Sequence, residues 1–181
     1  ESNPMPTLNY HHLLTCLKVK IGAESEDVSV SWGKIRNITL ESSNGITVAL
    51  NMDYTYESCV SLGATTTDMP FYKPESDIRF PDAEGFDIPH PLTSAQYSCY
   101  TICAPVEAEK YDEVEFNLSG NVVRIPEYYI TITSDNRSIT VPVDLRVANE
   151  DYYDGSTHGK LFTLNLSFLM GSNIAVSATV S

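Results

Sequence analysis

Hydrophobic and polar residues alternate most regularly near the end of the chain. Every second residue between positions 161 and 168 is apolar, and the same pattern returns between 174 and 180. An alternation of period two indicates a strand with one buried face and one solvent-facing face. Gly171, Ser172 and Asn173 separate the two segments and favour a turn. The sequence therefore predicts that residues 161–180 form an antiparallel β-hairpin.

Similar alternation recurs along most of the chain. Residues 13–21, 28–32 and 35–40 have the pattern of strands, and Asn44-Gly45 favours a tight turn into a return strand at 46–50, which together make a β-meander. Further strands are expected at 97–103, 113–118, 122–125, 128–133 and 139–145, the last with Pro142 as an edge or bulge signal. The expected fold is all-β, an antiparallel Greek-key β-sandwich of roughly seven to nine strands. Its predicted core comprises Leu17, Val19, Ile21, Ile38, Leu40, Val48, Val114, Phe116, Leu118, Ile130, Ile132, Leu164, Leu166, Phe168, Val176 and Val180.

Two segments depart from this pattern. Residues 1–12 contain prolines and polar residues and are expected to be a lead-in. Residues 51–95 contain five prolines among scattered aromatic residues, so any regular structure there should be short or at a sheet edge. The predicted organisation is a single β-sandwich domain over 13–181 with a long insertion at about 51–95.

Charge narrows the set of partners. The chain of 181 residues has 24 acidic and 11 basic side chains and a net charge of −13. Nucleic acids and anionic membranes select basic patches, so we expect neither as a partner. No apolar run is long enough for a membrane span. The start Glu1-Ser-Asn-Pro is typical of a processed or truncated product, which hides the targeting history.

Four cysteines leave the redox state open. Cys16, Cys59, Cys99 and Cys103 lack the paired spacing of a zinc site. Cys99 and Cys103 lie four residues apart in a predicted strand, about 13 Å from each other, which is too far for a mutual disulfide. Either of them remains able to pair with Cys16 or Cys59, although buried free thiols are the favoured interpretation.

No arrangement of residues indicates catalysis or a resident metal. The chain has no nucleophile elbow, phosphate-binding loop or zinc-protease motif, so we expect neither an enzyme nor a cofactor. Asp151 and Asp154 offer oxygen ligands for calcium, but their spacing does not match an EF-hand loop. His11 and His12 are adjacent and would point to opposite faces of a strand. We predict no metal site from either group.

Several of these patterns resemble one protein family. The segments Gly159-Lys-Leu-Phe-Thr-Leu-Asn-Leu-Ser-Phe168 and Ile174-Ala-Val-Ser-Ala-Thr-Val180 resemble the C-terminal strand pair of the fimbrillins and fimbrillin-like surface proteins of Bacteroidales. The stretch 8–19 is similar to a His-containing strand of that family, and 102–107 with 114–118 to its central strand pair. The sequence differs in stopping at Ser181 without the family's Trp, and in lacking most of the N-terminal domain.

The resemblance implies a transthyretin-like β-sandwich with a structural or adhesive role. It implies an exported lipoprotein at the outer membrane that assembles with other fimbrial subunits, as a homopolymer or heteropolymer, by strand exchange at a sheet edge. Host proteins or glycans are further expected partners. The shaft, anchor and tip roles stay open. The predicted assembly residues are Leu161, Phe162, Leu164, Leu166, Phe168, Ile174, Val176 and Val180, and a predicted partner-facing loop carries Tyr54, Tyr56, Phe71, Tyr72, Phe80 and Phe86.

A second function shares the same fold and compartment. Tyrosine rings stack well on the apolar faces of sugars. Exposed Tyr54, Tyr56, Tyr72, Tyr152 and Tyr153 would suit a surface lipoprotein that binds glycans for nutrient capture. A secreted hydrolase would need a convergent acid and base, and the sequence identifies no such pair.

Overall fold

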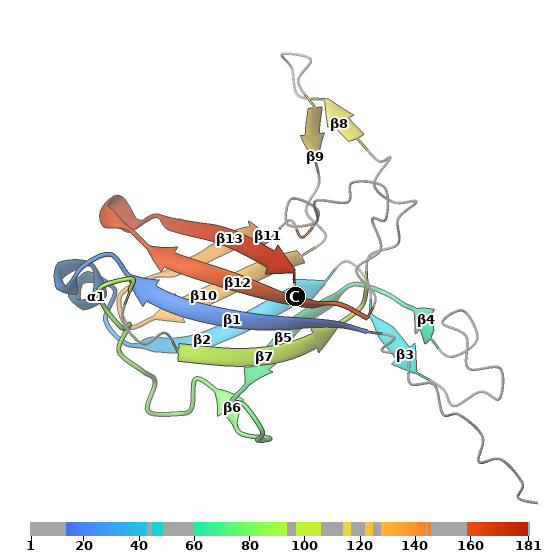
Figure 1. Cartoon of the computed structure of the whole chain (residues 1–181), viewed down its shortest axis with the longest axis horizontal. Coiled ribbons are helices and arrows are strands. Elements are labelled where there is room, and N and C mark those ends of the chain that lie inside the picture. The colour runs from blue at the N-terminus through green and yellow to red at the C-terminus, as the bar shows by residue number, and fades with distance from the viewer. Residues whose placement is uncertain are drawn as a thin grey trace, which may run out of the picture.

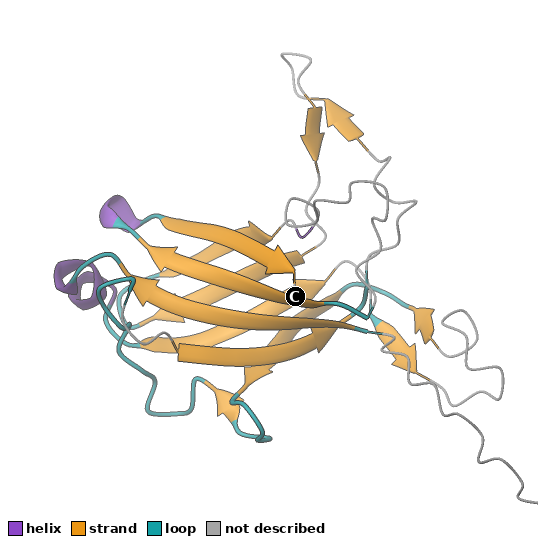
Figure 2. Cartoon of the chain, viewed as in Figure 1, coloured by secondary structure: helices purple, strands orange, loops and turns teal. Residues whose placement is uncertain are grey.

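Strands make up most of the structure. The computed structural model describes residues 14–42, 45–48, 60–93, 97–105, 114–116, 122–124, 128–143, 145 and 159–180. Figures 1 and 2 show a curved sheet with one short α-helix at one end. The elements are β1 (Thr15–Ala23), α1 (Glu26–Trp32), β2 (Ile35–Ser42), β3 (Ile46–Val48), β4 (Val60–Leu62), β5 (Thr66–Tyr72), β6 (Arg79–Phe80), β7 (Tyr97–Cys103), β8 (Val114–Phe116), β9 (Val122–Arg124), β10 (Tyr128–Ser134), β11 (Ser138–Val143), β12 (Leu161–Phe168), the 3₁₀ turn η3 (Met170–Ser172) and β13 (Ile174–Val180).

Nine strands join into one sheet. Their order is β11-β10-β2-β5-β7-β1-β12-β13, and β6 pairs with β5 beside this path. All neighbours are antiparallel except β1 and β12, which run parallel with Val19 opposite Leu164. The sheet curls until its two end strands, β11 and β13, come within 8 Å between some Cα atoms. The all-β class is therefore confirmed, while the strands form one mostly antiparallel, barrel-like sheet and a Greek-key sandwich is not confirmed.

The inner face of this sheet is the hydrophobic core. Buried and half-buried residues alternate strictly along β10 and β12, as the period-two pattern predicted. The predicted core residues Leu17, Val19, Ile21, Ile38, Leu40, Ile130, Ile132, Leu164, Leu166 and Phe168 are all buried. Val176 is half-buried and packs against this core. The side chains of Val48, Val114, Phe116, Leu118 and Val180 lie outside the described residues.

Residues 28–32 form part of a helix, so the predicted strand there is wrong. Ser25 caps the helix, its hydroxyl accepting a hydrogen bond from the Val28 N–H at 3.4 Å. Glu26 and Asp27 place negative charge in the first turn, where the helix dipole favours it. Val28 and Trp32, one turn apart, are buried, whereas Val30 is 69% exposed. A strand would have placed all three on one face.

The predicted meander over 35–50 is also wrong. β2 is a central strand that pairs with β10 and β5, and its return strand β3 pairs instead with β4. The two strands β3 and β4 form a separate small sheet. The turn signal at Gly45 does precede a strand, but local turn chemistry does not decide which strand becomes its partner.

The segment 51–95 contributes a central strand, β5, in contrast to the short or edge structure expected. β5 joins the two halves of the sheet: Thr39 of β2 lies opposite Pro70, and further along Tyr72 lies opposite Tyr100 of β7. Pro70 sits where the strand leaves one neighbour for the other. Its carbonyl accepts a hydrogen bond from the Thr101 hydroxyl at 3.0 Å. The N–H that proline lacks falls where the ladder already changes from β2 to β7.

The edge position predicted from Pro142 is confirmed. β11 ends the sheet path and pairs with β10 alone. Pro142 lies opposite Tyr129 in this ladder. An edge strand tolerates a residue without an N–H because one side of its backbone has no ladder to support.

Candidate functional site

The C-terminal hairpin is present, but its two strands have different environments. In β12, Phe162, Leu164, Leu166 and Phe168 are buried in the core. β12 lies between β1 and β13, so both of its edges are paired. These four residues are not exposed while the sheet is intact, and their role in assembly stays a prediction. Leu161 is half-buried at the start of the strand.

β13 is the outer strand of the hairpin. Ile174, Val176 and Ala178 are half-buried against the core, and the residues between them are exposed. In the described part of the chain β13 pairs only with β12, with Val176 opposite Leu166. This leaves one side of its backbone without a ladder, and such an edge is a template for another strand.

The described members of the predicted partner-facing group, Phe71, Tyr72, Phe80 and Phe86, do not lie together on the surface. Phe71 and Phe80 face each other across β5 and β6 and are buried, so a partner-facing role is wrong for both. Phe86 packs on Phe80 with ring centroids 4.7 Å apart. Tyr72 alone among the described members is exposed, at 39%. Tyr54 and Tyr56 lie outside the described residues.

The two end strands of the sheet, β11 and β13, come close to each other without pairing. We call the line along which they meet the seam. Following the strand directions through the sheet shows that β11 and β13 run parallel, both starting at the end that carries α1. Val143 is 1% exposed and Val141 7%, while Ile139 is only half-buried. The inward side chains of β11 are therefore less buried toward the first residues of the strand, and the seam is more open at the end that carries α1.

A pocket lies at this open end. Trp32, Asn136, Arg137, Ser138 and Ile139 line it, and its volume is about 410 Å³. We call it the Trp32 pocket. Ser138 and Ile139 are the first residues of the edge strand β11, so the pocket adjoins the free backbone of that strand. Sequence reasoning could not identify this pocket, because its two sides are more than 100 residues apart in the chain.

Trp32 forms the inner wall of the pocket. Its ring is fully buried, meets Phe168 edge-on at 4.8 Å and is covered by the Arg137 guanidinium at 4.7 Å. This stacking is a cation–π contact. The indole Nε1 is a buried donor to which no acceptor among the described residues is bonded. Leaving such a donor unsatisfied costs about 1–3 kcal/mol, so an acceptor reaching it would be favoured.

The turn between β10 and β11 holds the pocket residues in place. The Ser134 hydroxyl accepts hydrogen bonds from the backbone N–H groups of Asn136 and Arg137. The side chains of these two residues both donate to the carbonyl oxygen of Ser31, at 3.1 and 3.2 Å. The last turn of α1 has orphan carbonyls, and these donors satisfy one of them. Helix and turn thus fix each other.

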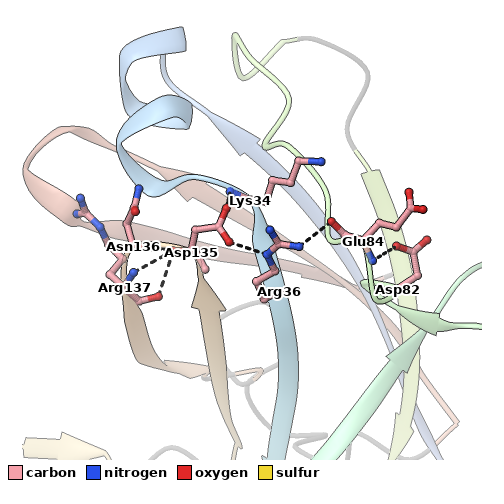
Figure 3. A network of polar contacts seen from close by, with 8 residues as sticks. Lys34, Arg36, Asp82, Glu84, Asp135, Asn136 and Arg137 are labelled. Atoms are coloured by element: carbon pink, nitrogen blue, oxygen red, sulfur yellow. Dashed lines mark hydrogen bonds and ion pairs between the residues drawn. The ribbon is translucent and has the colours of Figure 1, made fainter.

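A polar network extends this connection along the surface (Figure 3). Asp135 accepts hydrogen bonds from the Lys34 backbone N–H at 3.1 Å and from Arg36 Nε at 2.6 Å. Arg36 also donates to the Glu84 carbonyl oxygen at 2.8 Å. The hydrogen bond from Arg36 lowers the pKa of Asp135, so this carboxylate stays ionised. The pair is exposed and contributes mainly by orienting the turn.

In this network the Asp135 carboxylate and the Arg36 guanidinium are bonded to each other. Within the described ranges no three His, Cys, Asp or Glu side chains come together in a way that would hold a metal. His11, His12, Asp151 and Asp154 fall outside those ranges. No helix in the described part of the chain has the length and apolar character needed to cross a membrane.

Three cysteines are free thiols. Cys99 and Cys103 of β7 are buried, and Cys16 of β1 is half-buried; Cys59 lies outside the described residues. Burial raises the pKa of Cys103 to about 12 and raises that of Cys99 as well. Burial also raises the pKa of Cys16. A thiol is reactive as a thiolate, so the buried pair should be inert in the folded protein.

We expect a Cys59→Ser variant to show this protection directly. At pH 8, Cys99 and Cys103 should resist a thiol-specific reagent until denaturant is added, while Cys16 reacts slowly. The pKa of Cys103 is higher in the folded protein than in the unfolded chain, where it is near 9. Burial of the neutral thiol therefore contributes its full stabilisation below pH 9, and this contribution is lost as the pH rises toward 12. Thermal midpoints measured between pH 7 and 11 should therefore fall. Immediate reaction of all three thiols at pH 8 would contradict the burial.

One outward-facing pair involves a tyrosine predicted to stack on sugars. Tyr72 of β5 and Tyr100 of β7 are directly opposite on the outer face of the sheet. Lys18 Nζ lies 5.7 Å from the centre of the Tyr100 ring. Sequence reasoning did not select Tyr100, because its partner across the sheet depends on the path of β5. Tyr152 and Tyr153 are outside the described residues.

Comparison with known proteins gives partial structural similarity only. No family model matches the sequence, and no curated protein matches it. A solved structure described as a "putative cell adhesion protein" from Bacteroides uniformis ATCC 8492 is similar at a TM-score of 0.46 and 14% identity, over 94% of this chain and 51% of that chain. Another with the same description, from Bacteroides ovatus ATCC 8483, has a TM-score of 0.40 and 10% identity, over 93% and 44%. The chain thus spans about half of these neighbours, and no residue role is transferred from them.

Proposed function

We propose that this chain is a non-enzymatic structural or adhesive subunit of cell-surface fimbriae, exported and displayed at the outer membrane, which assembles with other subunits by strand exchange. The observation that carries the proposal is the seam between two unpaired edge strands, β11 and β13. The resemblance of residues 159–168 and 174–180 to the C-terminal strands of fimbrillins supports the same role.

Strand exchange follows from the physical chemistry of an open edge. Alternate N–H and C=O groups of an edge strand point away from its single neighbour, and a strand from another molecule satisfies them. β13 is the strand best suited to exchange, since it has one ladder and its inward side chains are only half-buried. Its removal would expose the edge of β12 together with core residues such as Leu166. An incoming strand of the same pattern would restore both.

Polymer formation provides the test. The surface fraction of the source cells, run unboiled on a denaturing gel and probed with an antibody to this chain, should give a regular ladder that collapses to one band on boiling. Deletion of residues 174–181 should abolish the ladder and leave the rest of the fold partly intact. A synthetic peptide of residues 173–181 should bind the truncated chain and raise its thermal midpoint. A ladder that persists unchanged after the deletion would refute β13 as the exchanged strand.

A second function has one specific observation in its favour. The cross-strand pair Tyr72 and Tyr100, with Lys18 beside it, forms an aromatic and cationic surface on the outer face of the sheet. Such a surface suits sugar stacking, as required of a surface lipoprotein that captures glycans. Under this alternative, a glycan array gives a signal that Tyr72→Ala and Tyr100→Ala each remove. A chain that stays monomeric at every temperature and retains that signal would favour glycan capture over assembly.

A further inference from the structure

We propose that the outward face of strands β7, β1, β12 and β13 binds an acidic polysaccharide, which stacks on Tyr100 and whose carboxylates are bound by Lys18 and Lys20. This inference rests on the second proposed function, glycan capture, and adds the charge of the glycan and the cations that recognise it. The carrying observation is a pair of lysines without acidic partners among the described residues of a strongly acidic protein. We call the outward face of these four strands the lysine face.

The lysine face contains no acidic side chain. The four strands are neighbours in the sheet and lie side by side in Figure 1, and none of them contains Asp or Glu. The whole chain, by contrast, has 24 acidic side chains against 11 basic ones. Lys18 and Lys20 both point outward along β1, because Leu17, Val19 and Ile21 fill the core.

Neither lysine is neutralised by a described neighbour. The ion pairs of the described part of the chain join Arg36 to Asp135 and Lys73 to Asp82. No ion pair or hydrogen bond between described residues involves the ammonium group of either lysine on this face. Uncompensated cations that lie together in a protein of net charge −13 select an anionic ligand.

The strand register brings these cations next to aromatic rings. Tyr72, Tyr100 and Lys18 follow one another across β5, β7 and β1, and Lys20 lies two residues further along β1. Lys18 Nζ lies 5.7 Å from the centre of the Tyr100 ring, so a sugar stacked on that ring has its substituents within reach of the ammonium group. The two lysine Cα atoms are about 7 Å apart along the strand, so one acidic oligosaccharide can contact both.

Polar side chains on the neighbouring strands suit the hydroxyl groups of sugars. Asn165 of β12 lies opposite Lys20, and its Nδ2 donates to the Ser177 hydroxyl at 3.5 Å. The Thr179 hydroxyl donates to the Thr163 carbonyl oxygen, also at 3.5 Å. Both hydrogen bonds are long and therefore weak, so exchanging them for bonds to a ligand costs little.

This combination favours an acidic polysaccharide over other polyanions. A carboxylate forms charge-assisted hydrogen bonds with the ammonium groups, while the pyranose rings supply the apolar faces and hydroxyl groups that the rest of the surface matches. A nucleic acid is a poorer occupant, because two lysines neutralise few phosphates and the net charge of the protein repels the others.

A pair of double variants of the full chain tests the cations. Lys18→Gln with Lys20→Gln removes both charges from the lysine face. Lys34→Gln with Arg79→Gln makes the same change of charge outside these four strands, at the residue before β2 and in β6. A difference between the two double variants therefore depends on where the charge is lost, and not on the net charge of the protein.

A second pair of variants tests the stacking surface. Tyr100→Leu keeps an apolar side chain but removes the flat ring. Tyr129→Leu is the matched control, because Tyr129 is a half-buried outward tyrosine of β10 that lies opposite Glu41. Thermal melts establish that every variant is folded.

Binding is measured by calorimetry with polygalacturonate, with its highly methyl-esterified form as the matched neutral polymer, and with polyphosphate as a polyanion without sugar rings. The wild type should prefer polygalacturonate to both, and its affinity should fall as salt screens the lysines. The double lysine variant should bind polygalacturonate roughly tenfold more weakly and Tyr100→Leu roughly fivefold more weakly, while both controls match the wild type.

The other outcomes each overturn a defined part of the inference. If the esterified polymer binds equally well and the double lysine variant is unchanged, the role of the lysines is refuted and glycan capture stands. If polyphosphate binds as tightly as polygalacturonate, the lysine face is a general polyanion surface and the sugar is refuted as its ligand. If the folded wild type binds none of the three polymers, the inference fails, while the glycan array and the gel ladder still decide between the two proposed functions.

Discussion

Replacing Phe71 with alanine is expected to lower the free energy of unfolding by about 3–5 kcal/mol. Phe71 is fully buried, and β5 places it opposite Phe80 where the two halves of the sheet join. Removing its ring would leave a cavity that the backbone of a central strand cannot close by collapsing. Equilibrium urea unfolding followed by circular dichroism measures the loss.

The adjacent residue is the matched control. Tyr72 points to the opposite, outer face and is 39% exposed, so Tyr72→Ala should cost less than about 1 kcal/mol. Equal losses for the two variants would place both side chains in similar environments and contradict the alternation of β5. A near-neutral Phe71→Ala would support the surface role that the sequence predicted for this residue.

The largest effect is expected for Leu164→Asp, which should prevent folding altogether. Leu164 is fully buried in β12 opposite Val19 of the parallel strand β1. An unpaired carboxylate at this position costs several kcal/mol, which is comparable to the total stability of a typical domain of about 5–15 kcal/mol. The purified variant should lack a cooperative thermal transition and be cleaved rapidly by protease.

Asn165→Asp provides the contrast one residue away. Its side chain points outward and lies 3.5 Å from the Ser177 hydroxyl of β13, so the new charge remains hydrated. This variant should fold with a thermal midpoint within a few degrees of the wild type. Folded, protease-resistant Leu164→Asp would show that β12 is not part of the core.

The strands that lie on the core could be predicted from the alternation of apolar and polar residues alone, whichever strands pair with them. The pattern over 161–168 depends only on which side chains face inward, so β12 and its buried residues followed from the sequence. The same reasoning misassigned 28–32, because Val28, Val30 and Trp32 fit the alternation of a strand, while only Val28 and Trp32 have the spacing of one helical turn. Ser25 followed by Glu26 and Asp27 was the signal for a helix, and the exposure of Val30 resolves the choice.

The pairing of the strands and the position of the Trp32 pocket could not be predicted from the sequence. Neither the parallel pairing of β1 with β12 nor the bridging position of β5 leaves a periodic signal, since both depend on contacts between distant segments. Pro70 argued against a central strand, and only the path of β5 between two neighbours makes it acceptable. The Trp32 pocket likewise arises where α1, the β10–β11 turn and the edge of β11 meet in space.

The parallel pair of β1 and β12 has a consequence for how the molecule reaches this structure. These two neighbours in the sheet come from nearly opposite ends of the described sequence. The half of the sheet they complete cannot close until β12 has been synthesised, and contacts between distant segments make β-proteins slow to fold. The apolar face of β1 therefore stays without its β12 neighbour while all the residues between the two strands are being made.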